Sequence, residues 1–315
     1  MVASFDRIDY STRTGKYAER RMMVEVFRRL AVFESLESYE YIGFGSVWFA
    51  DFILFHRVLG IRNMVSIEGE VASEDRVLFN RPYRIDVRMG LSGAVLPHVN
   101  WSGRKIAWLD YDDPITKAAL IDARTVARRA ASGSVLSVSV PCSFAPETRM
   151  QNSSIPAVDS FRSRFDAGQV PAKLMEAQLF GWLFGALSRN MLLSAIDDAL
   201  KVRALEGDML RFREICSFEY EDGAKMTTLT GIFYHDHDEP KLQECKFDQL
   251  DFWHDPGSPV RIVNPKLTIK EIRHLEAQLP FLGSGPLNHK AIPAEQVMNF
   301  VRFYRYFPKF TALEY

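Results

Sequence analysis

Residues 39–46, which read YEYIGFGS, and residues 65–68, which read VSIE, decide the fold of this chain. A short apolar segment enters a glycine turn, an apolar helix follows, and a second apolar segment ends on the carboxylate of Glu68. This order is typical of the first half of a nucleotide-binding α/β fold, in which the acid accepts ribose hydroxyls. The 25 residues from Gly43 to Glu68 are close to the roughly 20 that this geometry needs.

The glycine turn favours a particular kind of ligand. Gly43 and Gly45 are present, but Trp48 occupies the third position of the G-x-G-x-x-G pattern. A helix with tryptophan there cannot pack as closely on the strand, which makes a pyrophosphate cradle a poorer fit. The sequence therefore favours S-adenosylmethionine over NAD. A packing role for the two glycines, without any ligand, stays open.

Length and composition limit the classes of protein to which the chain can belong. The chain has 315 residues, 47% hydrophobic and 25% charged, with a formal net charge of −1. These values predict a globular α/β domain with insertions or an appendage. The charge provides no drive toward nucleic acid or anionic membrane. Three cysteines far apart in the sequence indicate a reducing cytoplasm, and neither a signal peptide nor a membrane span is expected.

Alternating apolar segments predict a mostly parallel, doubly wound sheet. Strands are expected at 40–44, 63–67, 84–88, 105–110 and 134–140. Ser46 is the expected N-cap of a helix that stops at Gly60. Asp113 and Pro114 are expected to begin the helix after the fourth strand.

The second half of the chain predicts a hairpin and two helical additions. Residues 214–220 and 226–234 flank Asp222-Gly223, a hairpin turn signal. A parallel sheet closed by an antiparallel hairpin is the Rossmann-like architecture of class I methyltransferases. We therefore divide the chain into a basic loop and helix, a Rossmann-like domain with a helical insertion, and a helical C-terminal extension, at 1–38, 39–235 (insertion 142–212) and 236–315.

Several motifs together resemble a known family. Residues 41–46, Glu68, residues 108–112 (WLDYD) and the opening residues 9–20 resemble a bacterial group of O-methyltransferases within the class I S-adenosylmethionine-dependent superfamily. The resemblance implies that Gly43, Gly45 and Ser46 contact the cofactor, that Glu68 binds ribose and that Asp110 lies at the reaction centre.

The resemblance also identifies weaker candidates. The acid that would hold the adenine amino group after the third strand is missing, which leaves Ser92 as the polar candidate there. Tyr10, Arg13 and Lys16 precede the first helix in a loop expected to fold over the cofactor.

Acidic residues after the fourth strand have two interpretations. Asp110 and Asp112 are the catalytic candidates, which would orient or deprotonate an acceptor hydroxyl. Mg²⁺ binding is the alternative, but residues 140–142 (VPC) add no ligand, so no metal is predicted. As structural elements, Asp113 is a helix cap and Asp112 a solvated loop acid. Residues 235–239 (HDHDE) are interpreted as a polar run leaving the last strand.

The sequence thus predicts a cytoplasmic S-adenosylmethionine-dependent methyltransferase that acts on oxygen or, less favoured, on nitrogen. A nucleotide-binding or S-adenosylmethionine-binding module that docks a partner protein without catalysis is the main alternative, and an NAD-linked oxidoreductase is the third. The helical tail would support a homodimer or a partner protein. The methyl acceptor cannot be read from the sequence.

Overall fold

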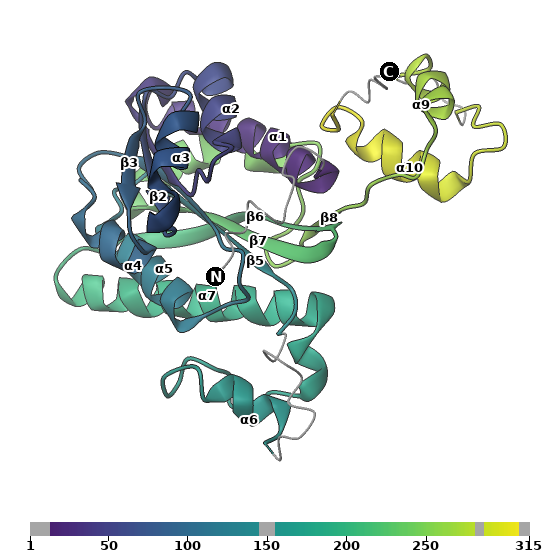
Figure 1. Cartoon of the computed structure of the whole chain (residues 1–315). Coiled ribbons are helices and arrows are strands. Elements are labelled where there is room, and N and C mark those ends of the chain that lie inside the picture. The colour runs from purple at the N-terminus through teal and green to yellow at the C-terminus, as the bar shows by residue number, and fades with distance from the viewer. Residues whose placement is uncertain (1–12, 145–154, 281–286, 309–315) are drawn as a thin grey trace.

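The computed structural model describes residues 13–144, 155–280 and 287–308. Their strands form one eight-stranded sheet, with helices around it (Figure 1). The strand order across the sheet is β3-β2-β1-β4-β5-β7-β6-β8. The strands are β1 (Glu40–Gly43), β2 (Asn63–Glu68), β3 (Asp86–Met89), β4 (Lys105–Asp110), β5 (Val135–Pro141), β6 (Arg211–Asp222), β7 (Ala224–Tyr234) and β8 (Val260–Ile262).

The direction of the strands confirms the predicted fold class. Strands β1 to β5 pair in parallel. Strand β7 runs antiparallel to β5 and forms the predicted hairpin with β6, around Gly223 at φ +86°. A parallel sheet closed by this hairpin is the class I methyltransferase architecture that the sequence predicted.

Helices cover both faces of the sheet (Figure 1). One apolar cluster joins one face to α1 (Thr14–Arg28), α2 (Ala50–Leu59) and α3 (Glu74–Asn80). A second cluster joins the other face to α4 (Ser92–Val95), α5 (Lys117–Arg129) and α7 (Gly181–Leu205). This arrangement leaves the carboxyl ends of the parallel strands as the edge where loops meet.

The start of α2 differs from the prediction. Ser46 and Phe49 both have left-handed backbones, with φ of +48° and +46°, and the helix begins only at Ala50. The N-cap expected at Ser46 is therefore wrong, because the turn takes three further residues to reverse direction. The predicted stop is confirmed, since Gly60 ends the helix at φ +73°.

The cap of α5 is a second correction. The helix begins at Lys117, and the hydroxyl of Thr116 accepts a hydrogen bond from the backbone N–H of Ala119. Thr116 is the N-cap, and Asp113 lies in the loop before it. Threonine, like aspartate, is a favoured N-cap residue because its side-chain oxygen can accept a first-turn N–H.

The insertion and the tail add one unexpected strand. The insertion contains α6 (Ala157–Arg162) and α7, and the tail contains α8 (Glu239–Glu244), β8, α9 (Ile269–Glu276) and α10 (Ala294–Phe303). Strand β8 pairs in parallel with β6, so the tail is not only helical. The capping box of Thr268 and Glu271 is present. Figure 1 shows α9 and α10 to one side of the sheet, beyond β8. The predicted domain boundaries stay a prediction.

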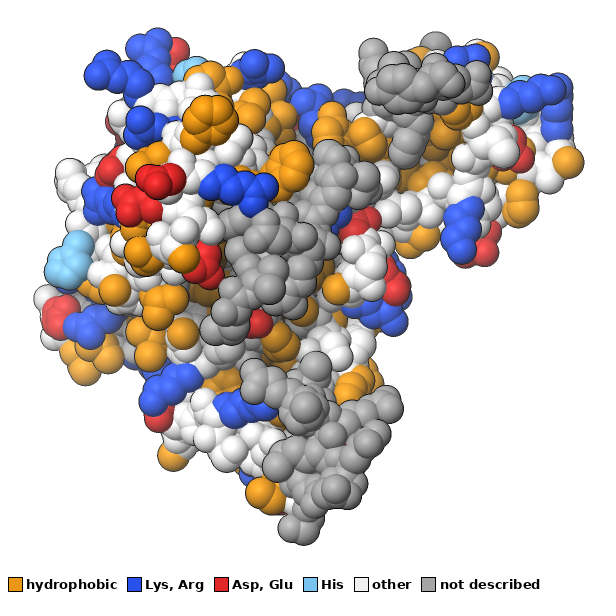
Figure 2. Space-filling view, viewed as in Figure 1, with side chains coloured by type: hydrophobic (Ala, Val, Ile, Leu, Met, Phe, Trp, Pro, Cys, Tyr) orange, Lys and Arg blue, Asp and Glu red, His pale blue; other side chains and the backbone are white. Residues whose placement is uncertain are grey.

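The surface is mixed in character. On the face drawn in Figure 2, basic and acidic side chains are interspersed among apolar ones across the described residues. In the part of the chain that the structure describes, no helix has the combination of length and apolar character that crossing a bilayer requires.

Candidate active site

The glycine turn between β1 and α2 is packed against its own neighbours. A Cβ added at Gly43 would lie 2.6 Å from the Tyr41 hydroxyl, and one at Gly45 would lie 2.6 Å from both Phe49 and the Ser66 hydroxyl. The glycines therefore make room for buried side chains, which is the packing role that the sequence left open. Contact of Gly43, Gly45 and Ser46 with the cofactor stays a prediction.

Glu68, the last residue of β2, is bonded directly to this turn. Its Oε1 accepts hydrogen bonds of 2.8 Å from the backbone N–H groups of Gly45 and Ser46, and one of 2.7 Å from the Ser66 hydroxyl. Among the described residues, none donates a hydrogen bond to the other oxygen, Oε2. Burial raises the pKa of Glu68, and the hydrogen bonds from Ser66, Ser46 and Gly45 oppose that shift. The carboxylate thus holds the turn with one oxygen and keeps the second available.

Ser92 lies at the start of α4, just after β3, and binds an acid from another helix. Its hydroxyl donates a short hydrogen bond to Oδ2 of Asp122 on α5, and the Tyr111 hydroxyl donates to the same oxygen over 2.7 Å. Asp122 is fully buried. Burial raises its pKa, and the bonds from Ser92 and Tyr111 oppose that shift. The sequence reasoning missed Asp122.

Asp110 ends β4 and forms an ion pair with Lys16. The Lys16 ammonium lies 2.8 Å from Asp110 Oδ2 and 2.9 Å from Glu19 Oε2, and only 2% of its side chain is exposed. It also lies 4.3 Å from the centre of the Trp108 ring. Burial favours a neutral amine, but the two carboxylates outweigh it and raise the pKa of Lys16. Lys16 is therefore a cation beside Asp110 at neutral pH.

The Lys16 pair continues into a buried hydrogen-bond chain. Glu19 accepts a short hydrogen bond from the Thr228 hydroxyl, which lies 2.7 Å from the Ser139 hydroxyl. The Trp108 ring N–H donates to Ser139 over 2.9 Å. Strands β4, β5 and β7 and helix α1 thereby fix the cation and Asp110 in place.

The first turn of α1 is held by the hairpin. Asp222 accepts the backbone N–H groups of Gly15 and Lys16 at 3.0 and 2.8 Å, and its Oδ1 also accepts from Asn264 at 2.9 Å. An acid at this end of a helix interacts favourably with the helix dipole. Lys16 was expected in a loop before the helix, but α1 already begins at Thr14, so that placement is wrong.

Two of the three remaining predicted site residues lie in the described part of the chain. Arg13 occupies the N-cap position of α1. Asp112 is exposed in the loop after β4. Tyr10 lies outside the described residues. A cofactor role for Arg13, Lys16 and Tyr10, and a catalytic role for Asp112, stay predictions.

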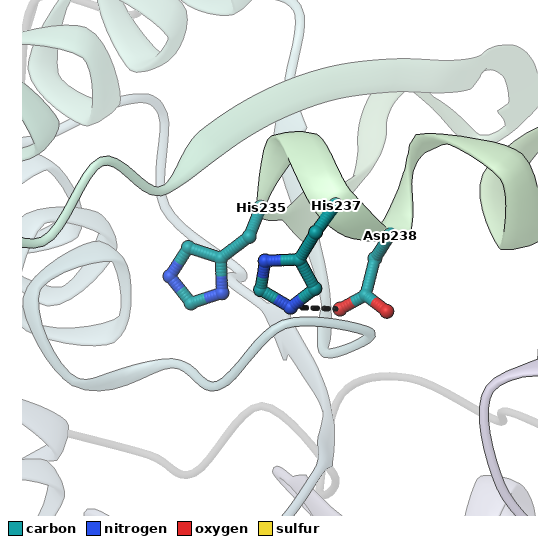
Figure 3. Close-up of side chains that lie close together, drawn as sticks. All are labelled: His235, His237 and Asp238. Carbon is teal, nitrogen blue, oxygen red and sulfur yellow. Dashed lines mark ion pairs between the residues drawn. The ribbon is translucent and has the colours of Figure 1, made fainter.

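A histidine cluster lies at the opposite edge of the sheet. Figure 3 shows the rings of His235 and His237 side by side, with the carboxylate of Asp238 next to His237. Two members of the cluster have partners outside it. His235 lies 2.7 Å from Asp208, and Asp238 lies 2.8 Å from the Lys241 ammonium.

The position of this cluster separates it from the candidate site. It follows the end of β7, whose Ile232 pairs with Val135 at the start of β5. It therefore lies at the amino ends of the parallel strands, away from Asp110, and we assign it no part in the reaction.

The carboxyl edge of the sheet carries a glycine turn, the acid Glu68 bonded to it and a buried acid–lysine pair, on strands arranged as in class I methyltransferases. The family described as "Putative O-methyltransferase" matches residues 8–315. The chain belongs to this family, so the protein is an enzyme of the methyltransferase class. The predicted cofactor, S-adenosylmethionine, agrees with this assignment.

Solved structures resemble the chain at low identity. An S-adenosylmethionine-dependent methyltransferase from Clostridium acetobutylicum is 7% identical with a TM-score of 0.41, over 73% of this chain and 94% of that one. The B. subtilis M1A22 tRNA methyltransferase is 10% identical with a TM-score of 0.36, over 67% of this chain and 68% of that one. A comparison with curated proteins found no match.

Proposed function

We propose that the protein transfers the methyl group of S-adenosylmethionine to an oxygen atom of its acceptor. One observation carries this proposal: Glu68, at the end of β2, is bonded to the glycine turn after β1, and Asp110 ends the neighbouring strand β4. In open α/β sheets ligands bind outside the carboxyl ends of the strands. A cofactor bound there would have the ribose acid on one side and Asp110 on the other.

Glu68 is suited to the ribose. Its Oε1 is occupied by the turn, while Oε2 can accept hydrogen bonds from the two ribose hydroxyls. A hydrogen bond to a charged group contributes about 1.5–3 kcal/mol. Because Oε1 holds Gly45 and Ser46 at the same time, the position of the ribose is coupled to the shape of the turn.

Asp110 and Lys16 are suited to an acceptor hydroxyl. In the transfer, the bond between the methyl carbon and the sulfonium sulfur breaks as a bond to the acceptor oxygen forms, and the hydroxyl proton must leave. Asp110 can accept that proton, and the Lys16 ammonium stabilises the developing oxyanion. A neutral amine acceptor instead gains positive charge as it is methylated, and the same ammonium does not stabilise that charge. This charge arrangement favours oxygen over nitrogen as the acceptor atom.

The remaining contribution of the protein is proximity. Holding the acceptor oxygen close to the methyl carbon and in line with the sulfur removes much of the entropic cost of the reaction. The insertion at 142–212 and the tail at 236–315 would form the lid and a homodimer or partner surface around this centre. An external metal ion has no step in this mechanism.

Calorimetry with S-adenosylhomocysteine tests the cofactor site. Glu68→Ala should weaken binding by the roughly 1.5–3 kcal/mol of the lost charged hydrogen bonds. Glu74→Ala removes an exposed acid of α3 and serves as the matched control, with unchanged affinity expected. Equal affinity of wild type and Glu68→Ala would remove the ribose role.

Turnover tests the reaction centre. Asp110→Asn should bind S-adenosylhomocysteine within a few-fold of wild type, yet form little of it from S-adenosylmethionine and an acceptor. Activity that is abolished by EDTA and restored by Mg²⁺ would contradict the metal-free mechanism. Cofactor binding without transfer to any hydroxyl compound would favour the binding-module alternative.

A further inference from the structure

The histidine cluster after β7 brings three metal-binding side chains together, away from the candidate active site (Figure 3). One ligand atom each from His235, His237 and Asp238 lies within 4.8 Å of the other two. The distance from His237 Nε2 to Asp238 Oδ2 is 3.5 Å, which is long for a hydrogen bond. Ligand atoms around a tetrahedral ion with bonds of about 2.0–2.2 Å lie roughly 3.4 Å apart. This pair therefore already has the spacing of two metal ligands.

An acid outside the cluster orients the His235 ring. The Nε2 atom of His235 lies 2.7 Å from Asp208 Oδ1, and the other oxygen of Asp208 lies 2.6 Å from the Arg203 guanidinium. Figure 3 shows the remaining ring nitrogen of His235, Nδ1, directed toward His237. Metal-binding histidines commonly donate the N–H of one ring nitrogen to a carboxylate, which leaves the other nitrogen for the ion. Asp208 therefore positions His235 Nδ1 as a ligand.

The Asp238 carboxylate is also fixed by its neighbours. Its Oδ2 accepts the Ser132 hydroxyl over 2.6 Å, and the oxygen of that hydroxyl accepts the backbone N–H of His235 over 3.2 Å. A carboxylate oxygen has two lone pairs, so Oδ2 can bind an ion and keep its bond from Ser132. Its Oδ1 lies 2.8 Å from the Lys241 ammonium, whose side chain is 45% exposed. Lys241 is therefore a competitor of the ion for the charge of Asp238.

The cluster is open to solvent on the histidine side. The side chain of His237 is 76% exposed and that of His235 is 29% exposed, whereas Asp238 is 6% exposed. The two rings are stacked, with centroids 5.2 Å apart. An ion can thus reach the ring nitrogens from solvent, with the carboxylate at the base of the site. The exposed His237 ring can turn to complete the coordination.

We propose that His235, His237 and Asp238 bind a divalent transition-metal ion of the zinc type. Two imidazoles and one carboxylate are a ligand set that Zn²⁺ accepts, with a water molecule in the fourth position. The site is separate from methyl transfer, because it lies at the amino ends of the parallel strands. All three ligands lie within residues 235–238, so the ion fixes the turn at which the tail leaves β7.

Calorimetry with ZnCl₂ tests the site on untagged protein that has been treated with EDTA and dialysed. Wild type should bind one ion per chain. His237→Ala should bind it about tenfold or more weakly, since loss of a ligand costs at least as much as loss of a group that orients one. Asp208→Ala should weaken binding by about 10–100-fold, and Asp208→Asn, which keeps an acceptor for the ring N–H, by less. His98→Ala removes another exposed histidine and should bind as wild type does.

Three further measurements sharpen the assignment. Lys241→Met removes the competing cation and should tighten Zn²⁺ binding several-fold, a direction that general damage to the protein would not produce. Mg²⁺, which prefers oxygen ligands, should give no binding at the same concentrations. An ion that binds only the folded state raises the melting temperature, so excess ZnCl₂ should raise the Tm of wild type and not that of His237→Ala.

Several results would overturn the proposal. These are wild-type protein that binds no Zn²⁺, equal affinities of wild type and His237→Ala, and loss of binding in His98→Ala, which would place the ion elsewhere. Weaker binding by Lys241→Met would contradict the role of Asp238 as a ligand. Should another variant fail to fold, His237→Ala decides the question, because its side chain is mostly exposed and its removal opens no cavity.

Discussion

Asp110 and Asp122 are two acids at the same edge of the sheet, and they are held in opposite ways. Asp110 has an ammonium group 2.8 Å away, which in turn contacts Glu19. Asp122 is held by two hydroxyl groups, and among the described residues no donor reaches its Oδ1. One acid belongs to a compensated charge network, and the other is buried with part of its hydrogen-bonding capacity unused.

This difference shows which interactions stabilise each carboxylate in the folded protein. A buried charge is tolerated when an opposite charge and hydrogen bonds replace water. Asp110 has the opposite charge within the protein, in the Lys16 ammonium. Asp122 accepts hydrogen bonds at one oxygen only, and its burial raises its pKa. The three predictions below test this contrast.

The largest effect is expected from removing the cation. Lys16→Met leaves Asp110 and Glu19 facing each other without compensation, and breaking a buried pair in this way costs about 3–5 kcal/mol. Urea unfolding measures the loss. Lys270→Met, which removes an exposed lysine of α9, should change stability little. A loss below about 1 kcal/mol for Lys16→Met would mean that Asp110 does not depend on this ion pair.

A smaller effect is expected from Tyr111→Phe, which removes one of the two donors to Asp122. A hydrogen bond to a charged group contributes about 1.5–3 kcal/mol, and chemical unfolding should show a loss of that order. Tyr220→Phe is the matched control, because the Tyr220 hydroxyl is buried without a hydrogen-bond partner in the described structure. Equal losses for the two variants would contradict the importance of the Tyr111 contact.

The smallest effect is a pH dependence. Because the pKa of Asp122 is raised on folding, the folded state holds its proton to higher pH than the unfolded state does. Stability should therefore fall as pH rises from the ordinary aspartate range through the folded pKa, by about 1.4 kcal/mol for each unit of difference. Asp122→Asn should lose this fall. Glu68 titrates in both proteins and cancels in the comparison. Parallel stability curves would show that Asp122 titrates normally.

The strands were predictable because each reads as a short apolar run bounded by turn residues. The turn after β1 could not be predicted, since Ser46 and Phe49 adopt left-handed backbone conformations, which are uncommon for residues other than glycine. The turn is held by a residue remote in sequence, because Glu68 accepts the backbone N–H groups of Gly45 and Ser46, while the Phe49 ring packs against Gly45. Local rules placed a cap at Ser46, but packing moved the start of the helix.

The site was predictable at the strand ends and not beyond them. Glu68 and Asp110 each end an apolar strand, and this position marks them in the sequence as candidate site residues. The partner of Asp110 could not be read, because Lys16 lies on a helix remote in sequence. Asp122 left a signal that was missed: it sits in the buried stripe of α5, beside Ala119 and Ala123. A carboxylate within the apolar face of a helix indicates a candidate site residue, as one at the end of a core strand does.

The contact between Asp222 and the start of α1 has a consequence for protein synthesis. Asp222 holds the backbone N–H of Lys16, 206 positions earlier in the chain. During translation α1 leaves the ribosome first, but its anchor arrives only when the β6 strand is complete. A nascent chain that ends before β6 therefore lacks this anchor for the helix that carries Lys16.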